Sequence, residues 1–171
     1  MLSIELINPH WLNEIEKDGD LCAHGGVRIC ANDIVFSDGE DTYWTVSAAS
    51  LYLLRTLTQD HTKNHRVSEH IIPCCGFKMF DQGEGEDVYI PGCPNGIDFE
   101  VKHLDSGYVL LMQENQQTQV SFDEYRKSVF QFADAVNHFY EVNVPRRPYD
   151  AEDAQGYEAF WAEWKRRRHE E

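Results

Sequence analysis

The apolar pattern changes its period at residue 121, and this change constrains the fold more than any other feature of the sequence. Between residues 97 and 120, apolar and polar residues alternate in short runs separated by turn-forming residues, which is typical of β-strands. From Phe122 to Tyr140, apolar residues recur every three or four positions, as on an amphipathic helix. Ser121 and Glu124 have the spacing of a capping box. The sequence therefore predicts strands followed by a helix over 122–141.

Residues 46–60 are apolar around most of a helical circumference, which is typical of a buried helix. Thr45 or Ser47 can serve as its N-cap. Arg55 is the only cation of this segment. A cation in so apolar a helix either reaches solvent or pairs with an acid, and we expect it to pair with an acid.

Residues 151–168 are predicted to form a last helix, which follows a short Pro/Arg linker at 144–149. Asp150 suits the N-cap position of this helix. Its aromatic residues fall on one face, at the positions Tyr157, Phe160, Trp161 and Trp164. We expect this face to pack on the core. The alternative is a partner-binding surface that contains Trp161 and Trp164, because Trp dominates many binding hot spots.

The remaining apolar runs predict an antiparallel sheet of about five to seven strands. A strand over 3–7 precedes a helical turn that Asn8 and Pro9 could open. Val27, Ile29 and Ala31 fall on one face of the first strand of a hairpin. Further strands are expected within 70–80, 86–93, 97–104, 107–114 and 118–120, joined by turn-rich clusters. The prediction is a single α+β domain over 1–171, with the helices mostly on one face of the sheet.

The charge of the chain favours some classes of partner and excludes others. With 15 basic and 30 acidic residues, the formal net charge is −15. Such a field repels nucleic-acid phosphates and anionic lipid surfaces, and it attracts basic proteins. The acids gather in two turn segments, at Asp38, Glu40 and Asp41 and at Asp81, Glu84, Glu86 and Asp87. We predict that these residues bind a basic protein partner; the alternative is that the acidity serves solubility alone.

The sequence indicates a cytoplasmic protein. Its first twenty residues lack a basic segment followed by an apolar one, and no apolar run reaches 18 residues. The chain has five cysteines, an odd number that does not suggest a disulfide framework. We therefore expect reduced thiols and no membrane association.

The cysteines and histidines offer candidate metal ligands but no metal-binding motif. The candidates are Cys22, His24, Cys74, Cys75 and Cys93. The sequence does not contain the zinc-site combination of a C-x₂₋₄-C pair with an H-x₃₋₅-H pair. Neighbouring residues of a strand point to opposite faces, so Cys74 and Cys75 cannot share a metal unless the strand bulges. We predict structural thiols and no cofactor, with zinc as the alternative.

No motif identifies a reaction. The chain lacks the sequence patterns of hydrolases, zinc proteases and nucleotide-binding loops, so no catalytic residue is predicted. In size, acidity and architecture it is similar to the small cytoplasmic bacterial proteins that act as immunity partners of toxins, although this likeness rests on no motif. The sequence favours an interaction module of the immunity or adaptor type that binds a basic protein. A zinc-binding accessory protein and a small enzyme are the alternatives.

Overall fold

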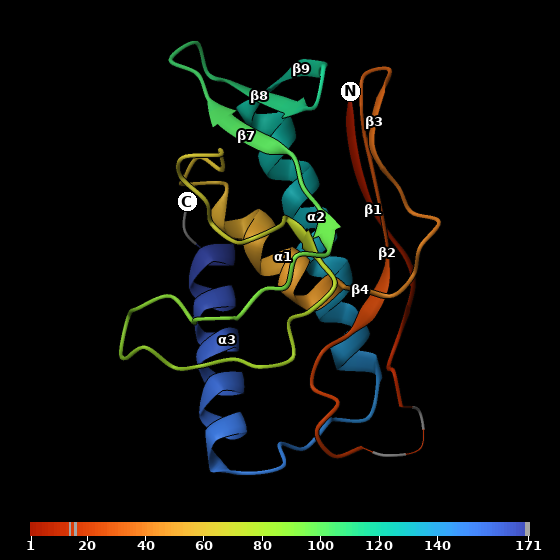
Figure 1. The fold of residues 1–171 in the computed structure, drawn as a ribbon, viewed down its shortest axis with the longest axis vertical. Helices are drawn as coiled ribbons and strands as arrows, with labels where there is room; N and C mark the ends of the chain where they lie inside the picture. The colour runs from red at the N-terminus through yellow and green to blue at the C-terminus, as the bar shows by residue number, and fades with distance from the viewer. Residues whose placement is uncertain (14, 16, 170–171) are drawn as a thin grey trace.

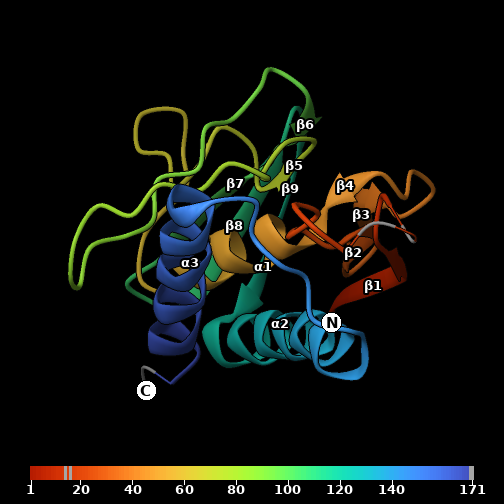
Figure 2. The same cartoon turned by 90° about the horizontal axis from the view of Figure 1, so that it is seen from below.

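Helix α1 (Val46–Arg55) lies in the middle of the molecule, and all ten of its residues are buried. Helices α2 (Phe122–Val142) and α3 (Ala151–His169) pack against it from two sides (Figures 1 and 2). The structure is a computed structural model, and it describes residues 1–13, 15 and 17–169. Within these residues, no helix combines the length and the apolar character needed to cross a membrane.

The strands form three small antiparallel sheets around the helices. The predicted α+β class is confirmed, but the strands are divided among three sheets instead of forming one. The first sheet contains β1 (Leu2–His10), β2 (His24–Ala31), β3 (Ile34–Asp38) and β4 (Trp44–Thr45). The second contains β5 (Ile72–Pro73) and β6 (Gly96–Ile97), and the third contains β7 (Glu100–His103), β8 (Tyr108–Gln113) and β9 (Gln116–Ser121).

The first sheet confirms the predicted hairpin and corrects the prediction for residues 8 and 9. Strands β2 and β3 pair antiparallel, and Val27, Ile29 and Ala31 are buried on one face. Asn8 and Pro9 open no helical turn, because β1 continues to residue 10 with a register shift after residue 7. Asn8 adopts φ 46°, a left-handed conformation that asparagine tolerates better than most residues. Pro9 is accommodated because β1 is an edge strand.

The structure confirms α2 almost residue for residue. The Ser121 hydroxyl accepts a hydrogen bond from the backbone N–H of Glu124 at 3.3 Å, as an N-cap does. The carboxylate of Glu124 accepts from the backbone N–H of Leu2 at 2.6 Å, and thereby ties α2 to β1. Tyr125, Phe132 and other members of the predicted apolar stripe are buried in the core.

Helix α1 is shorter than predicted, since it ends at Arg55 and not at residue 60. Thr45 occupies its N-cap, but its hydroxyl donates to the carbonyl oxygen of Cys74 at 2.9 Å and makes no capping bond. The predicted pairing of Arg55 is confirmed. Its guanidinium donates two hydrogen bonds to the carboxylate of Glu163 on α3, at 2.7 and 2.8 Å.

Arg55, Glu163, Arg167 and Asp87 form a set of charged side chains that we call the ionic network. Arg167 donates to Glu163 at 2.7 Å and to both carboxylate oxygens of Asp87 at 2.7 Å. The side chain of Glu163 is fully buried and those of the two arginines nearly so. Arg166 and Arg167 already hold the carboxylate of Asp87, and its partner-binding role stays a prediction.

The aromatic face of α3 packs against the core, as expected. Asp150 accepts from the backbone N–H of Asp153 at 2.9 Å and caps the helix. Trp164 is buried and Trp161 is half-buried. The ring of Trp161 meets that of Tyr140 on α2 edge-to-face, with centroids 4.9 Å apart. The ring of Trp164 is enclosed by the fold and that of Trp161 is partly so, and the alternative assignment of both residues to a partner surface stays a prediction.

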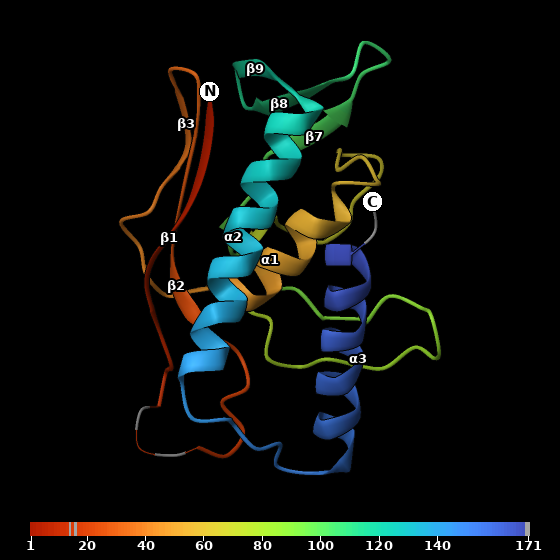
Figure 3. The same ribbon diagram turned by 180° about the vertical axis from the view of Figure 1, so that it is seen from behind.

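The segments predicted as strands over 70–80 and 86–93 are mostly irregular. They contribute β5 and a single bridge between Phe80 and Tyr89. Figure 3 shows the loop of residues 80–90 beside α3. At Val88, side chains bind the backbone in place of a neighbouring strand. Arg55 donates to the carbonyl oxygen of Val88 at 2.8 Å, and Glu163 accepts from the N–H of Val88 at 2.8 Å.

Candidate metal centre

Strands β5 and β6 bring two cysteine-containing loops together. The two strands pair antiparallel over two residues each. The backbone N–H of Cys74, the first residue after β5, donates to the carbonyl oxygen of Asn95 at 3.2 Å. Cys75 is next in the chain, and Cys93 lies two residues before Asn95. The short sheet therefore places three of the five cysteines at one end of the same strand pair.

The sulfur atoms of Cys74, Cys75 and Cys93 all lie within 4.8 Å of one another, and we call this group the thiol centre. All three residues are half-buried. The prediction that Cys74 and Cys75 face opposite sides is wrong. Strand β5 ends at Pro73, so the alternation of side chains that holds within a strand does not extend to the two cysteines.

The three thiols also influence one another's protonation. Hydrogen bonding with Cys93, together with partial burial, raises the pKa of Cys75 to about 12. A backbone hydrogen bond at Asn95 and a hydrogen bond with Cys75 lower the pKa of Cys93. Cys93 therefore loses its proton before Cys75.

Cys22 and His24, the other predicted metal ligands, stay outside the thiol centre. The thiol of Cys22 is buried and donates to the carbonyl oxygen of Gly76 at 3.1 Å. Burial raises its pKa to about 12. Nδ1 of His24 lies 3.0 Å from the carbonyl oxygen of Cys22, and burial lowers the pKa of this imidazole. Both residues are hydrogen-bonded members of the interior.

The geometry of the thiol centre suits a thiophilic metal ion. Thiolates select zinc, monovalent copper and iron–sulfur clusters over hard cations. With Zn–S bonds of about 2.3 Å in a tetrahedral shell, two sulfurs on one zinc ion lie roughly 3.8 Å apart. The spacing of the three sulfurs requires at most a small contraction to reach this value. Three protein ligands would leave a fourth coordination position open, as in zinc sites that exchange ligands.

A cavity of about 440 Å³ adjoins the thiol centre. Cys74 belongs to both. The other residues that line the cavity come from β4, from β6 and from the loops that precede these strands, and they are Asp41, Tyr43, Trp44, Pro94, Asn95 and Gly96. The centre therefore lies beside a space large enough for a small molecule or a single side chain.

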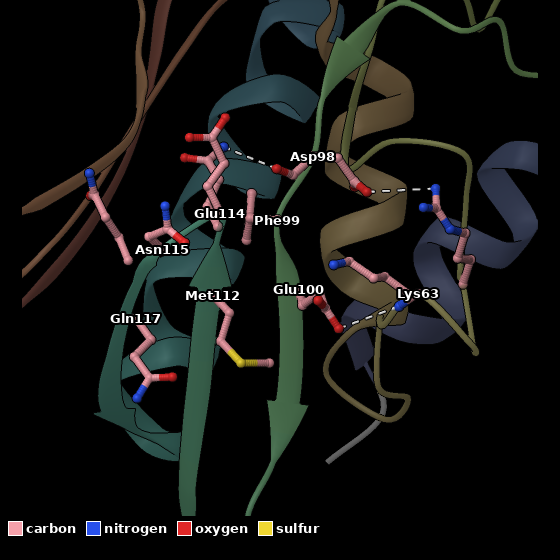
Figure 4. A pocket seen from close by; sticks show the side chains of 11 residues that line it. Lys63, Asp98, Phe99, Glu100, Met112, Glu114, Asn115 and Gln117 are labelled. Carbon is pink, nitrogen blue, oxygen red and sulfur yellow. Dashed lines mark hydrogen bonds and ion pairs between the residues drawn. The ribbon is translucent and has the colours of Figure 1, made fainter.

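A second cavity, of about 320 Å³, lies where β7 and β8 face the loop after α1 (Figure 4). Its Asp98 carboxylate accepts from Nε2 of His61 at 2.9 Å and lies 3.6 Å from Arg66. Burial raises the pKa of Asp98 and the hydrogen bond from His61 lowers it, and the net shift is downward. Nδ1 of His61 accepts from the backbone N–H of Val67 at 3.1 Å. Both ring nitrogens are engaged, so His61 has no free nitrogen with which to take a proton from a substrate.

The acidic turn residues other than Asp87 lie exposed in two loops. Asp38, Asp41 and Asp81 each accept a hydrogen bond from a backbone N–H two residues ahead, which orders the loops. In the part of the chain that the structure describes, none of the predicted acids in these loops forms an ion pair apart from Asp87. These residues are Asp38, Glu40, Asp41, Asp81, Glu84 and Glu86.

The sequence contained one usable signal for the thiol centre. Both cysteine segments are bracketed by turn-forming residues, as "PCCG" over 73–76 and "PGCPNG" over 91–96. Because proline and glycine commonly end strands, the alternation of side chains between the two faces of a strand should not have been expected at Cys74 and Cys75.

We compared the chain with protein-family models, with curated proteins and with solved structures, and none of them matches it. A function for this protein therefore has to be argued from its own residues.

Proposed function

We propose that the protein binds a thiophilic metal ion, with Zn²⁺ as the leading candidate, through Cys74, Cys75 and Cys93. The observation that carries this proposal is the convergence of three sulfur atoms within 4.8 Å of one another. The role is that of a metal-binding accessory protein, because three ligands with an open fourth position suit exchange or delivery better than a purely structural site.

The contrast with Cys22 supports a ligand role over simple packing. A cysteine in a protein interior behaves as a small apolar residue, and Cys22 does so in the core. The thiol centre is half-buried in two loops that join short strands, where three apolar side chains would gain little from burial. Thiolate ligands must stay reduced to bind metal, so the proposal places the protein in the reducing cytoplasm.

Elemental analysis of protein purified without chelators tests the proposal. We expect about one equivalent of zinc per chain, or one equivalent after loading with Zn²⁺, as for a site of this type. Each of the changes Cys74→Ser, Cys75→Ser and Cys93→Ser should remove most of it. Cys30→Ser is the matched control, since Cys30 is a half-buried cysteine on β2 outside the thiol centre.

Two results would refute a metal-binding role. One is a parent protein that stays free of metal after loading with Zn²⁺ and with monovalent copper. The other is a variant with all three cysteines replaced that retains as much metal as the parent.

The exposed acidic loops favour a second candidate function, the binding of a basic protein partner in an immunity-type or adaptor role. The carboxylates of Asp38, Asp41 and Asp81 are ordered by backbone hydrogen bonds, and within the described residues none of the six acids is engaged in an ion pair. A cluster of such groups can raise the rate of association with a basic protein by 10- to 1,000-fold, in a manner that salt suppresses.

The salt dependence of binding tests this second candidate. Partners captured from native lysate at low salt should associate more slowly at 1 M salt, and more slowly with a variant that neutralises the six loop acids to Asn or Gln. These acids are Asp38, Glu40, Asp41, Asp81, Glu84 and Glu86. A control variant neutralises exposed acids outside the two loops, at Asp105, Asp123 and Glu158. Equal association rates for the two variants would argue against the acidic loops as the contact.

A further inference from the structure

The cavity beside the thiol centre combines one carboxylate with two aromatic side chains. Asp41, Tyr43 and Trp44 contribute these groups, and none of the residues that line the cavity is basic. Its volume, about 440 Å³, lies within the usual range for small-molecule sites, roughly 300 to 1,000 Å³. The chemistry of this lining distinguishes the cavity from the one in Figure 4, where Lys63 and Arg66 already accompany the acids.

The fold holds these groups in place. Oδ1 of Asp41 accepts from the backbone N–H of Tyr43 at 2.9 Å. The ring of Tyr43 meets that of His10 edge-to-face, with centroids 5.9 Å apart, although Tyr43 is 69% exposed. Trp44 belongs to β4 and pairs with Gly25 of β2. Asp41, Tyr43 and Trp44 are therefore each held by a contact within the fold, and the second carboxylate oxygen of Asp41 is not used by the hydrogen bond from Tyr43.

We propose that this cavity binds an organic cation, an alkylammonium or alkylguanidinium group. A carboxylate attracts such a cation, and the faces of Trp and Tyr attract it through their ring quadrupoles. An anionic ligand would meet the carboxylate of Asp41 with no basic side chain in the lining to offset it. A small amine and a Lys or Arg side chain of a basic peptide both supply the required group.

Nuclear magnetic resonance titrations with four probes of equal chain length test this proposal. We expect butylammonium and butylguanidinium to shift the indole N–H signal of Trp44, which a Trp44→Phe variant assigns. Butanol and butyrate should bind more weakly than either cation. Asp41→Asn keeps the Oδ1 acceptor for Tyr43 but loses the charge, and it should weaken cation binding roughly two- to fivefold, the range of an exposed ion pair.

Asp105→Asn is the control. Asp105 is an exposed acid in the turn between β7 and β8, and it does not line the cavity. Its replacement should leave the affinity for butylguanidinium unchanged. Butanol binding as tightly as the two cations, or equal effects of the two Asn variants, would overturn the proposal.

A further arm separates the sources of the cation. Tighter binding of a blocked Gly-Arg-Gly peptide than of butylguanidinium identifies a basic protein as the source, and the reverse identifies a small amine.

Discussion

The ionic network and the thiol centre are two polar clusters built on opposite plans. In the ionic network, each charged group meets a partner of opposite charge, and the carboxylate of Glu163 accepts from Arg55, from Arg167 and from the backbone of Val88. In the thiol centre, three groups of the same kind converge. The three thiols can hydrogen-bond to one another, but none of them supplies a charge of opposite sign to its neighbours.

The difference between the two clusters separates a stabilising role from a binding role. Buried charges that are fully paired hold the fold together, and removing one partner leaves the others uncompensated. Converging groups of one kind contribute little to the stability of the fold, because they neutralise no opposite charge in their surroundings. They acquire a common partner only when a cation arrives. The predictions that follow are arranged from the largest expected effect to the smallest.

Replacing Glu163 should break the ionic network. Glu163→Gln removes the charge that Arg55 and Arg167 share and leaves both guanidinium groups in the interior. We expect the free energy of unfolding to fall by about 3 to 5 kcal/mol, as for other buried pairs that lose one partner. Urea denaturation measures this loss. Glu158→Gln, an exposed change on the same helix, should alter stability little, and equal effects of the two changes would contradict the role given to Glu163.

Metal should affect the thiol centre in the opposite sense. At a free zinc concentration 100 times the dissociation constant, binding to the folded state alone raises the free energy of unfolding by about 2.7 kcal/mol. The same titration on Cys93→Ser should give a much smaller gain. Thermal denaturation with and without zinc measures both, and a stabilisation that survives the change of Cys93 would place the metal elsewhere.

Asp87 should give the ionic network a dependence on pH. Although burial raises the pKa of Asp87, hydrogen bonds from Arg167 and Arg166 lower it below its ordinary value of 3.8. A carboxyl whose folded pKa is depressed stabilises the fold above its unfolded pKa, and this contribution is lost as the pH falls through the folded pKa. Asp87→Asn should therefore cost about 1 kcal/mol at pH 7, since the pair is partly exposed.

The difference between the parent and Asp87→Asn should shrink below pH 4 and vanish once Asp87 is protonated in the folded state. Urea denaturation at a series of pH values follows it. A difference that stays constant from pH 7 to pH 2 would show that the charge of Asp87 is not what stabilises the contact with α3.

The smallest effect is expected when a thiol is replaced in the absence of metal. Cys93 is half-buried and its neighbours in the centre are thiols, so Cys93→Ser should change the free energy of unfolding by less than about 0.5 kcal/mol in chelator. This result, beside the loss expected for Glu163→Gln, would sharpen the contrast between the two clusters. A large loss in chelator would mean that the thiol centre serves the fold.

The parts of the fold that were predictable from the sequence have local signals. The capping spacing of Ser121 and Glu124 and the apolar stripe that follows determine α2 within one turn of chain. The sequence also predicted that Arg55 pairs with an acid, because the rest of its helix is largely apolar. The identity of that acid was not predictable, since Glu163 lies 108 residues further along and reaches Arg55 only through the packing of α3 on α1.

The thiol centre could not be predicted for a related reason. It depends on the pairing of β5 with β6, two strands of two residues each that are too short to show any periodicity. Cys74, Cys75 and Cys93 were all identified as candidates, but their convergence could not be foreseen, because only this pairing fixes the position of the loop that carries Cys93. The prediction of a strand within 86–93 was wrong because side chains of the ionic network, and not a neighbouring strand, bind the backbone of Val88.

The separation of Arg55 and Glu163 along the chain also has a consequence for synthesis on the ribosome. At roughly 5 to 20 residues per second, the 108 residues that follow Arg55, up to and including Glu163, take about 5 to 20 seconds to translate. During that interval α1 carries a guanidinium whose carboxylate partner has not yet been made, so the central helix cannot be enclosed on its α3 side. The nascent chain must expose that apolar surface until its last segment emerges, and chaperones that recognise exposed apolar segments have this window in which to bind it.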